Sequence, residues 1–408
     1  MSLVWHDKPV ILGGSPILEE PVSIARPTLP EIKKIQGEFC QIYHSGMVTN
    51  SHYVQRFEEE AADYLGVKEA VCVSSCTSGL MLVIKALELT GEVIIPSFTF
   101  FASGHALLWN NLKPVFVDCL PSTYNLNHNI IYESITPNTS AIMAVHIFGN
   151  PVEIESIQKI ADDNNLKVII DSAHAIGTRY KGRLVGSFGD AEVFCLSPTK
   201  VLTAIEGGII TTNNQELAKR LRIGRDYGNS GNYDCEFLGL SARMEEFNAL
   251  IGLKGLEDIE EIVAKRSKLV NLYQENIGQI PGILFQRIDA ANTSSYKDLG
   301  IIINRDEFGL DRDRLAYALD IEGVATKKYF YPPLHQQKLY SRYQQDPLTA
   351  TEYVSNNILC LPLYSHMEEK IVQDICHAIW RIYSCREEIS QLLHSKQKRL
   401  NLDSAPVA

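Results

Sequence analysis

The sequence predicts an α/β protein with a large domain, built on a mostly parallel sheet between helices, and a smaller C-terminal α+β domain. Short apolar runs alternate with helical patterns through residues 31–258, which is typical of parallel strands covered on both faces. The last third of the chain instead mixes short strands with amphipathic helices. Because 408 residues exceed what one compact core usually holds, we expect two domains.

The expected elements of the large domain follow a regular order. Residues 1–30 are rich in Pro and Gly and predict an arm that packs on the body or on a partner subunit. Residues 31–258 then form the large domain. Strands are predicted at 70–73, 92–96, 114–118, 141–147, 167–171, 191–196 and 207–212, and helices at 31–43, 54–66, 79–89, 101–110 and 153–164.

A long charged helix, predicted over residues 252–277, leads out of the large domain. We place the small domain at residues 259–392 and expect a polar tail without regular structure at 393–408. Inside the small domain we expect a strand within 296–304 and helices at 311–323 and 365–383.

Composition excludes several classes of function. The net charge of -11 disfavours general affinity for nucleic acids or acidic membranes. The nine cysteines form no CxxC pair and the eleven histidines show no metal-type pairing, which favours reduced thiols over disulfides or a metal site. No apolar run approaches the roughly 18 residues that a membrane span needs. We therefore expect a cytoplasmic protein without metal, membrane or nucleic-acid partners.

Two residues point to pyridoxal 5'-phosphate (PLP). Asp171 ends the apolar run KVIID, and Lys200 lies between the apolar runs AEVFCL and GGIITT, where we expect burial. PLP needs a lysine amine to form a Schiff base and an acid to keep its ring nitrogen protonated. Taken singly, Asp171 is more often a turn residue and Lys200 a solvated charge; the pair in this context favours the cofactor.

A phosphate site is predicted where the segment SSCTSG, residues 74–79, runs into a helix. The free N–H groups of that helix, with the hydroxyls of Thr77 and Ser78, suit a phosphate. Taken alone, the same residues are more simply explained as a helix cap.

Aromatic and imidazole side chains complete the predicted pocket. Phe100 or Phe101 is placed to stack on a pyridine ring, although a lone Phe is more often a core residue. His174, three residues past Asp171, is placed to reach the phenolic oxygen of the cofactor, although a single His is usually structural.

An ordered set of motifs resembles the DegT/StrS sugar aminotransferase family of fold-type-I PLP enzymes over roughly residues 10–385. The motifs are SSCTSGL, PSFTFFAS, PVFVD, AVHIFGNP, IIDSAHAIGTRYKGRLVGSFGDAEVF, SPTKVLT followed by EGG, GLSARMEEFNALIGL and FYPPLHQQ. The resemblance implies that Lys200 forms the Schiff base and Asp171 pairs with the ring nitrogen. It also implies a stacking role for Phe100, contact of His174 with the phenolic oxygen, and phosphate binding by Thr77 and Ser78.

The resemblance further implies a homodimer with its active sites at the interface. A partner loop, matching GLSARM with Ser241 and Arg243, would reach the phosphate. The chain departs from the family pattern at three positions. Cys195 stands where many members have a Ser that binds the phosphate, and a thiol is a weaker hydrogen-bond donor than a hydroxyl. Ser241 stands where many members have Asn, and Ile205 stands where Gly usually precedes the EGG run.

The implied activity is transfer of an amino group from an amino acid, glutamate by resemblance, to a keto-sugar that is most often nucleotide-linked, with the cofactor alternating between PLP and pyridoxamine phosphate. A keto-cyclitol acceptor and a PLP-dependent sugar dehydratase are alternatives; in the best-known dehydratase a His replaces the lysine, so Lys200 favours transfer. A PLP-binding regulator and a nicotinamide enzyme are disfavoured, the latter because no GxGxxG motif follows a strand.

Five basic residues are possible contacts for a substrate diphosphate or carboxylate. For each of them a solvated surface charge is the more common explanation. They are Arg183, Arg222, Arg225, Lys327 and Lys328.

Overall fold

The computed structural model describes residues 7–343 and 346–403, with side chains as far as residue 395. Within these residues the main sheet has seven strands in the order β1-β9-β8-β5-β4-β2-β3. They are β1 (Glu69–Val73), β2 (Glu92–Pro96), β3 (Lys113–Val117), β4 (Thr139–Val145), β5 (Lys167–Asp171), β8 (Ala191–Cys195) and β9 (Gly208–Thr212).

Strand direction explains where the functional residues meet. β9 pairs antiparallel with both β1 and β8, whereas β2–β3, β2–β4, β4–β5 and β5–β8 are parallel pairs. The prediction of a mostly parallel sheet is therefore confirmed. The carboxyl ends of all strands of this described sheet except β9 lie along one edge, which is where open parallel sheets bind ligands.

Helices cover both faces of the sheet because its strands are apolar on both sides. Val71 and Val73 pack into the cluster formed with α3 (Cys76–Ala86), α4 (Phe101–Trp109) and α6 (Gln215–Gly224). Ala70 and Cys72, one residue out of step, pack into the opposite cluster. That second cluster includes α2 (His52–Leu65), α5 (Ile154–Asn164) and α7 (Glu246–Glu257).

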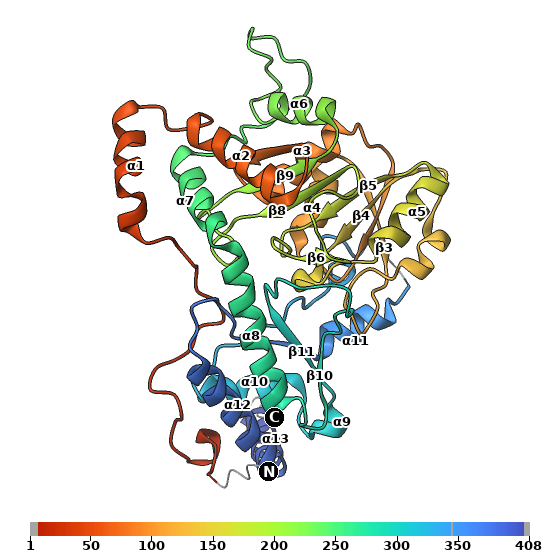
Figure 1. Cartoon of the computed structure of the whole chain (residues 1–408). Helices are drawn as coiled ribbons and strands as arrows, with labels where there is room; N and C mark the ends of the chain where they lie inside the picture. The colour runs from red at the N-terminus through yellow and green to blue at the C-terminus, as the bar shows by residue number, and fades with distance from the viewer. Residues whose placement is uncertain (1–6, 344–345, 404–408) are drawn as a thin grey trace.

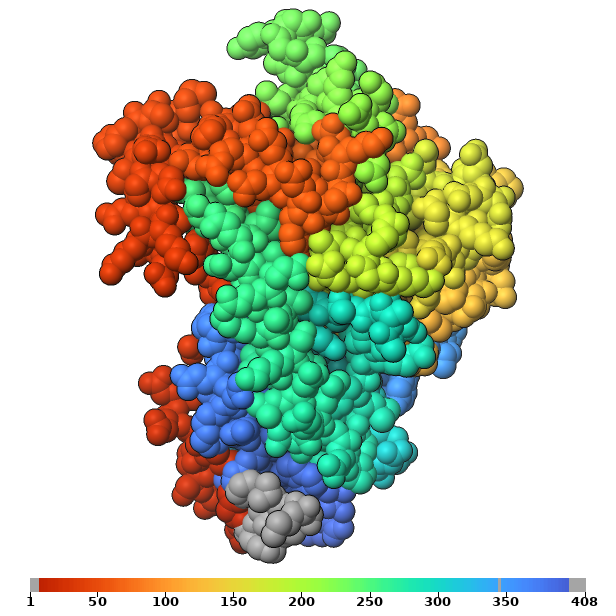
Figure 2. Space-filling model, viewed as in Figure 1, coloured from red at the N-terminus to blue at the C-terminus, as the bar shows by residue number. Residues whose placement is uncertain are grey.

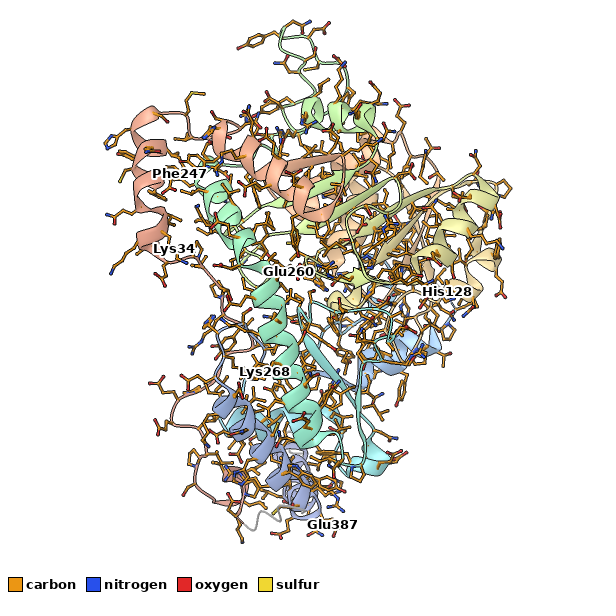
Figure 3. The ribbon with its side chains drawn as sticks, in the orientation of Figure 1. Lys34, His128, Phe247, Glu260, Lys268 and Glu387 are labelled. Atoms are coloured by element: carbon orange, nitrogen blue, oxygen red, sulfur yellow. The ribbon has the colours of Figure 1, made fainter. Side chains whose placement is uncertain are left out.

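Helix α1 (Ile32–Ser45) stands at the side of this body and contacts α7 (Figure 1). Phe247 of α7 points toward α1 (Figure 3), and its ring lies 4.4 Å from the ring of Phe39. Much of the remaining surface of α1 is exposed.

The predicted helix over 252–277 is two helices. α7 ends at Glu257, and α8 (Ile259–Ile277) begins after Asp258, whose φ of -102° and ψ of 6° leave the helical region. α8 runs from the large sheet into the C-terminal part of the chain (Figure 1), so one helix contributes to both apolar cores.

The C-terminal part has its own core and a small antiparallel sheet in the order β10-β11-β12. The two apolar clusters meet within α8, between Ile262 and Leu269, and a division of the large and small domains at residue 258 stays a prediction. The strands are β10 (Ile283–Phe285), β11 (Leu299–Ile303) and β12 (Ile358–Leu361), and the helices are α9 (Arg305–Phe308), α10 (Arg312–Ile321), α11 (Thr349–Asn357), α12 (Glu369–Ser384) and α13 (Arg386–Asp403).

Short elements fill the connections. The strands β6 (Arg179–Tyr180) and β7 (Arg183–Leu184) form a hairpin. The 3-10 helices are η1 (Val10–Leu12), η2 (His128–Ile130), η3 (Tyr132–Ser134), η4 (Ile147–Gly149) and η5 (Leu334–Gln336). No helix in the described part of the chain is both long and apolar enough to cross a bilayer.

The described part of the N-terminal arm packs on the C-terminal core of the same chain. The N-terminal residues lie beside the C-terminal ones in Figure 2, and Arg381 of α12 donates to the Asp7 carboxylate at 3.1 Å. Val22 donates its N–H to Gly323 O at 2.8 Å. Residues 1–6 of the predicted arm lie outside the described residues.

The expectation of a tail without regular structure from residue 393 is wrong as far as Asp403, because α13 continues to that residue. Its first turns are anchored by Ile389, which is fully buried, and by Leu393, which packs on the C-terminal core. Good helix formers such as Gln, Lys, Arg and Leu then extend the helix. Residues 404–408 lie outside the described residues.

Candidate active site

A cavity of about 240 Å³ lies where β1, β2, β4, β5 and β8 end. The loops that follow these strands supply one wall, and two segments of the small domain supply another. The lining residues are Cys76, Thr77, Thr99, Phe100, Ala102, Val145, Asp171, Ala173, His174, Cys195, Ser197, Thr199, Lys200, Lys297, Asp298, Tyr329 and Phe330.

Asp171 is the last residue of β5, and its carboxylate is buried and held at both oxygens. Ser103 Oγ donates to Oδ2 at 2.6 Å, and the Ala173 N–H donates to Oδ1 at 3.1 Å. Burial raises the pKa of Asp171, while these two hydrogen bonds and the charge of Lys200 oppose that rise. The carboxylate therefore faces the cavity in one fixed orientation.

His174 is a neutral hydrogen-bond donor at neutral pH. The Phe148 N–H donates to its Nδ1 at 3.2 Å, so the ring proton is assigned to Nε2. Burial, together with the charges of Lys200 and Lys297, holds the pKa of His174 well below its ordinary value. The ring lies nearly parallel to that of Phe330, at an angle of 10°, which fixes its plane.

Lys200 occupies the loop between β8 and β9. Its N–H closes a turn onto Ser197 O at 3.0 Å, and the following residues Val201 and Leu202 are buried and anchor the loop. The prediction that this connection is buried is wrong for the lysine itself, which is half-buried, because the loop forms the rim of the cavity. Lys200 and Asp171 line the same cavity, as the sequence predicts.

Thr77 lines the cavity, but Ser78 does not. Ser78 and Ser75 form a reciprocal capping box at the start of α3: Ser78 N–H donates to Ser75 Oγ at 3.1 Å, and Ser75 N–H donates to Ser78 Oγ at 3.2 Å. The helix-cap explanation therefore describes Ser78, while Thr77 and the first turn of α3 are open to the cavity.

Two thiols lie near each other at the start of α3 and the end of β8. The Cys195 thiol donates to Ser197 Oγ at 3.4 Å, and the Cys76 thiol donates to Val193 O at 3.9 Å. The neighbouring Cys76 thiol, aided by the charge of Lys200, holds the pKa of Cys195 well below its ordinary value. Cys195 also lines the cavity, which is the place that the resemblance implies for this position.

Phe100, rather than Phe101, lines the cavity. It is the residue before α4, and 43% of its surface is exposed, so its ring face is not occupied by core packing. The Phe101 ring lies 3.8 Å from it and supports it from outside.

Ser241 and Arg243 lie outside the cavity of this chain. Ser241 is exposed, and Arg243 pairs with Asp226 and lies 5.5 Å from the Tyr227 ring centre. A role for them at a neighbouring subunit's site stays a prediction.

The five basic candidates also lie outside the cavity. Arg222 pairs with Glu69 at 2.8 Å and Lys328 with Asp313 at 2.6 Å. The solvated explanation is wrong for Arg225, which is buried and pairs with Glu58, because α6 packs tightly on β1.

Sequence reasoning missed the wall contributed by the small domain. Lys297 and Asp298 come directly before β11, while Tyr329 and Phe330 lie in a loop about thirty residues further on. A signal was present, since adjacent opposite charges before a five-residue apolar strand predict a buried pair. Nothing in the sequence indicated that this strand faces the cavity.

A second buried carboxylate, Glu192 of β8, lies near the end of β5. Glu192 of β8 accepts from Ser172 Oγ at 2.5 Å and from two backbone N–H groups, and burial raises its pKa to about 7. His146 Nε2 lies 3.8 Å away, but burial lowers the pKa of His146 to about 3. The ring is therefore neutral, and this contact is not an ion pair.

Among residues 7–343 and 346–403, no group of three or more His, Cys, Asp or Glu residues is arranged to hold a metal ion. The nine cysteines all fall within the described ranges and are free thiols.

Comparison with known proteins places these observations in a family. A sequence model of the DegT/DnrJ/EryC1/StrS aminotransferase family matches residues 30–380. The dTDP-4-amino-4,6-dideoxy-D-glucose transaminase of Escherichia coli is 33% identical over 362 residues, covering 88% of this chain and 97% of that protein. The dTDP-3-amino-3,6-dideoxy-alpha-D-galactopyranose transaminase of Aneurinibacillus thermoaerophilus is 34% identical over 352 residues, covering 86% and 95%.

Solved structures show the same similarity. A crystal structure of DesI in the presence of its TDP-sugar product superposes with a TM-score of 0.90 at 31% identity, covering 95% of this chain and 99% of DesI. PseC of Helicobacter pylori, an aminotransferase involved in the biosynthesis of pseudoaminic acid, gives a TM-score of 0.84 at 25% identity, covering 90% and 100%. The similarity therefore extends over nearly the whole chain.

Proposed function

This chain belongs to the DegT/DnrJ/EryC1/StrS aminotransferase family, and we propose that it transfers an amino group from glutamate to the keto group of a nucleotide-linked sugar. It is a PLP-dependent transaminase. The observation that supports the assignment of residues is that Lys200 and Asp171, predicted separately from the sequence, line one cavity.

The cavity fits PLP on three independent grounds. A buried carboxylate, Asp171, is held by Ser103 with its remaining lone pairs toward the cavity. His174 presents a neutral Nε2–H donor, which matches a phenolic oxygen. Lys200 reaches the same space from the rim. When bound, PLP supplies an aldehyde carbon that a lysine amine attacks and a ring that stores the electrons of the reacting bond.

The chain's own residues then hold the cofactor and move protons. Lys200 Nζ would hold the cofactor covalently and, once released, accept the proton from the donor's α-carbon. The Asp171 carboxylate would keep the proton on the ring nitrogen by direct charge pairing. His174 Nε2–H would donate to the phenolic oxygen, and Phe100 would cover one face of the ring.

The first turn of α3 is the natural phosphate site. Its free N–H groups and positive dipole end attract an anion, and Thr77 adds a hydroxyl. The Cys195 thiol and the Ser197 hydroxyl lie in the same wall and would complete it.

A homodimer would cover the apolar surface around α1. The GLSARM segment joins that surface, since Asn50 N–H donates to Met244 O at 3.1 Å and Glu246 N–H donates to Val48 O at 2.9 Å. A cluster of exposed apolar side chains of this kind marks an association site. The exposed side chains, on α1 and the segment after it, are Ile32, Phe39, Tyr43, Met47 and Val48.

Sedimentation velocity tests the dimer. Wild-type protein is expected to sediment as a dimer, and the double substitution Tyr43→Glu with Met47→Glu is expected to shift it toward monomer with loss of activity. A wild-type monomer with full activity would remove Ser241 and Arg243 from the proposed site.

The relatives aminate different ring carbons, as the names of the dTDP-4-amino and dTDP-3-amino transaminases state. We therefore propose the substrate class without a ring position. The free thiols are in keeping with a cytoplasmic enzyme.

Spectroscopy and product analysis test this function. The purified protein with PLP is expected to show a visible absorption band that glutamate bleaches and a dTDP-linked keto-sugar restores, with an amino-sugar released. Lys200→Ala is expected to lose both changes and the borohydride-stable attachment of the cofactor to the chain. If glutamate leaves the spectrum unchanged while the keto-sugar loses oxygen, the protein is a dehydratase and the proposal fails.

A further inference from the structure

The small-domain wall of the cavity contains a buried lysine–aspartate pair. Lys297 and Asp298 are only 5% and 7% exposed, and Lys297 Nζ lies 2.8 and 2.9 Å from the two carboxylate oxygens of Asp298. Both residues line the cavity that Lys200 lines. The Tyr329 ring centre is 5.3 Å from the Lys297 ammonium.

The backbone that carries this pair is fixed from both domains. Lys297 N–H donates to Phe148 O at 2.9 Å, in the loop after β4. Arg266 of α8 donates from Nη2 to Lys297 O at 2.7 Å and from Nε to Tyr296 O at 2.8 Å. The pair is therefore preorganised, as a binding group must be.

A buried ion pair costs desolvation and contributes little stability compared with apolar residues of similar size. Burial lowers the pKa of Lys297, and the neighbouring Asp298 carboxylate opposes that effect. Lys297 and Asp298 are buried beside Lys200 despite this desolvation cost. Recognition of a ligand explains the pair better than a contribution to stability does.

The chemistry of the pair selects the ligand. An ammonium has three N–H donors, of which Asp298 takes two, and each carboxylate oxygen has a further lone pair. A donor and an acceptor thus stand side by side with no net charge. A sugar hydroxyl, which both accepts and donates, matches this arrangement, whereas a carboxylate only accepts and is repelled by Asp298.

We propose that Lys297 and Asp298 bind a hydroxyl of the keto-sugar, on a ring carbon next to the keto carbon, and so determine specificity for the amino acceptor and not for the amino donor. We place this hydroxyl next to the keto carbon because the pair and Lys200, the residue assigned to the reaction at that carbon, line the same cavity. This inference rests on the proposed function.

The two half-reactions, followed separately by the cofactor spectrum, test the proposal. The first uses the PLP form with glutamate; the second uses the pyridoxamine form with a dTDP-linked 4-keto-6-deoxy sugar. Asp298→Asn and Lys297→Gln are expected to raise the half-saturating sugar concentration by roughly 10- to 100-fold, as for lost hydrogen bonds to charged groups. The glutamate half-reaction is expected to change by less than about 2-fold.

A substrate analogue that lacks the proposed hydroxyl gives a second test. The 3-deoxy counterpart of the sugar is expected to react roughly 10- to 100-fold less efficiently than the parent with wild-type enzyme, but with Asp298→Asn the two sugars are expected to react alike. If Asp298→Asn folds poorly, the analogue on wild-type enzyme decides alone, and an analogue as good as the parent overturns the proposal.

Lys268→Gln is the matched control. Lys268 of α8, labelled in Figure 3, pairs with Glu369 at 2.5 Å, and its side chain is 70% exposed, so neither half-reaction should change. Slowing of the glutamate half-reaction by the Lys297 or Asp298 variants would assign the pair to the donor and overturn the proposal, as would no effect on either half. A wild-type enzyme that reacts with glutamate but with no keto-sugar would instead overturn the proposed function.

Discussion

The two walls of the cavity are built in different ways. The sheet wall places Asp171 at the end of β5, and His174 and Lys200 in the loops after β5 and β8, each within a few residues of a buried apolar run. The small-domain wall places Lys297 and Asp298 before an antiparallel strand, and holds them through Arg266 and the Phe148 carbonyl. The first wall follows from local sequence, whereas the second exists only because two domains pack together.

The two walls therefore have different proposed roles: the sheet wall carries out the reaction, and the small-domain wall recognises the sugar. The groups to which we assign the PLP reaction lie on the sheet wall, at the carboxyl ends of strands of the sheet. The small-domain wall carries a neutral donor–acceptor pair suited to a particular substrate. Variation of the second wall can therefore change the substrate while the first wall keeps the reaction.

The largest expected effect is on the sheet wall. In the proposed function the Asp171 carboxylate holds the proton on the ring nitrogen, so Asp171→Asn should lower kcat by roughly 10²- to 10⁴-fold. The protein should still fold, because asparagine keeps the shape and accepts from Ser103. Steady-state kinetics measure the effect, with Asp163→Asn, an exposed carboxylate that accepts from Tyr132, as control. An active Asp171→Asn enzyme would contradict the assignment.

The stability of the small-domain wall should depend on the Arg266 side chain. Arg266→Met leaves buried carbonyls of Tyr296, Lys297 and Leu363 without donors, so the free energy of unfolding should fall by about 3 kcal/mol. The sugar half-reaction should weaken more than the glutamate half-reaction. Urea unfolding measures the change in stability. The control is Arg220→Met, which removes an exposed ion pair with Glu88 and should change the free energy of unfolding by less than about 0.5 kcal/mol. Equal loss in both half-reactions would mean that the two walls are not separate.

Glu192, buried in β8, should make the free energy of unfolding depend on pH. Its pKa is raised from 4.5 to about 7, so between these values the folded chain keeps a proton that the unfolded chain releases. Stability therefore decreases as pH rises through this window, by up to about 3 kcal/mol. Glu192→Gln should remove this slope, as seen by urea unfolding at several pH values. Parallel curves for the two proteins would show that Glu192 does not titrate there.

The smallest expected effect is at Ile205, on the rim near Lys200. This β-branched residue has a φ of 66°, in the left-handed region that glycine favours, and is 46% exposed. Ile205→Gly should raise the free energy of unfolding by about 1 kcal/mol, measured at fixed protein concentration. Destabilisation instead would show that the isoleucine side chain is buried against a second subunit.

Sequence reasoning succeeded where one residue's environment depends on its immediate neighbours. Asp171 and Lys200 follow apolar strands whose direction is predictable, so their convergence could be expected. The role of Ser78 could not be settled from the sequence, because its hydroxyl is equally suited to a capping box and to a phosphate; the structure places it in a capping box with Ser75, and phosphate binding by Ser78 stays a prediction. Arg225 was expected on the surface, because its buried partner Glu58 is 167 residues away in the chain.

By itself the sequence determined the α/β class, a mostly parallel sheet whose strand ends share one edge, and the choice of Lys200 and Asp171 as candidates for a PLP reaction. Those follow from periodicity and from residues placed directly after strands, which are local properties of the chain. Only the tertiary structure decided that Thr77 and not Ser78 faces the cavity, that Ser103 orients Asp171, and that Lys297 and Asp298 form the second wall. These depend on contacts between segments far apart in the chain, where small differences in packing determine which side chain reaches the cavity.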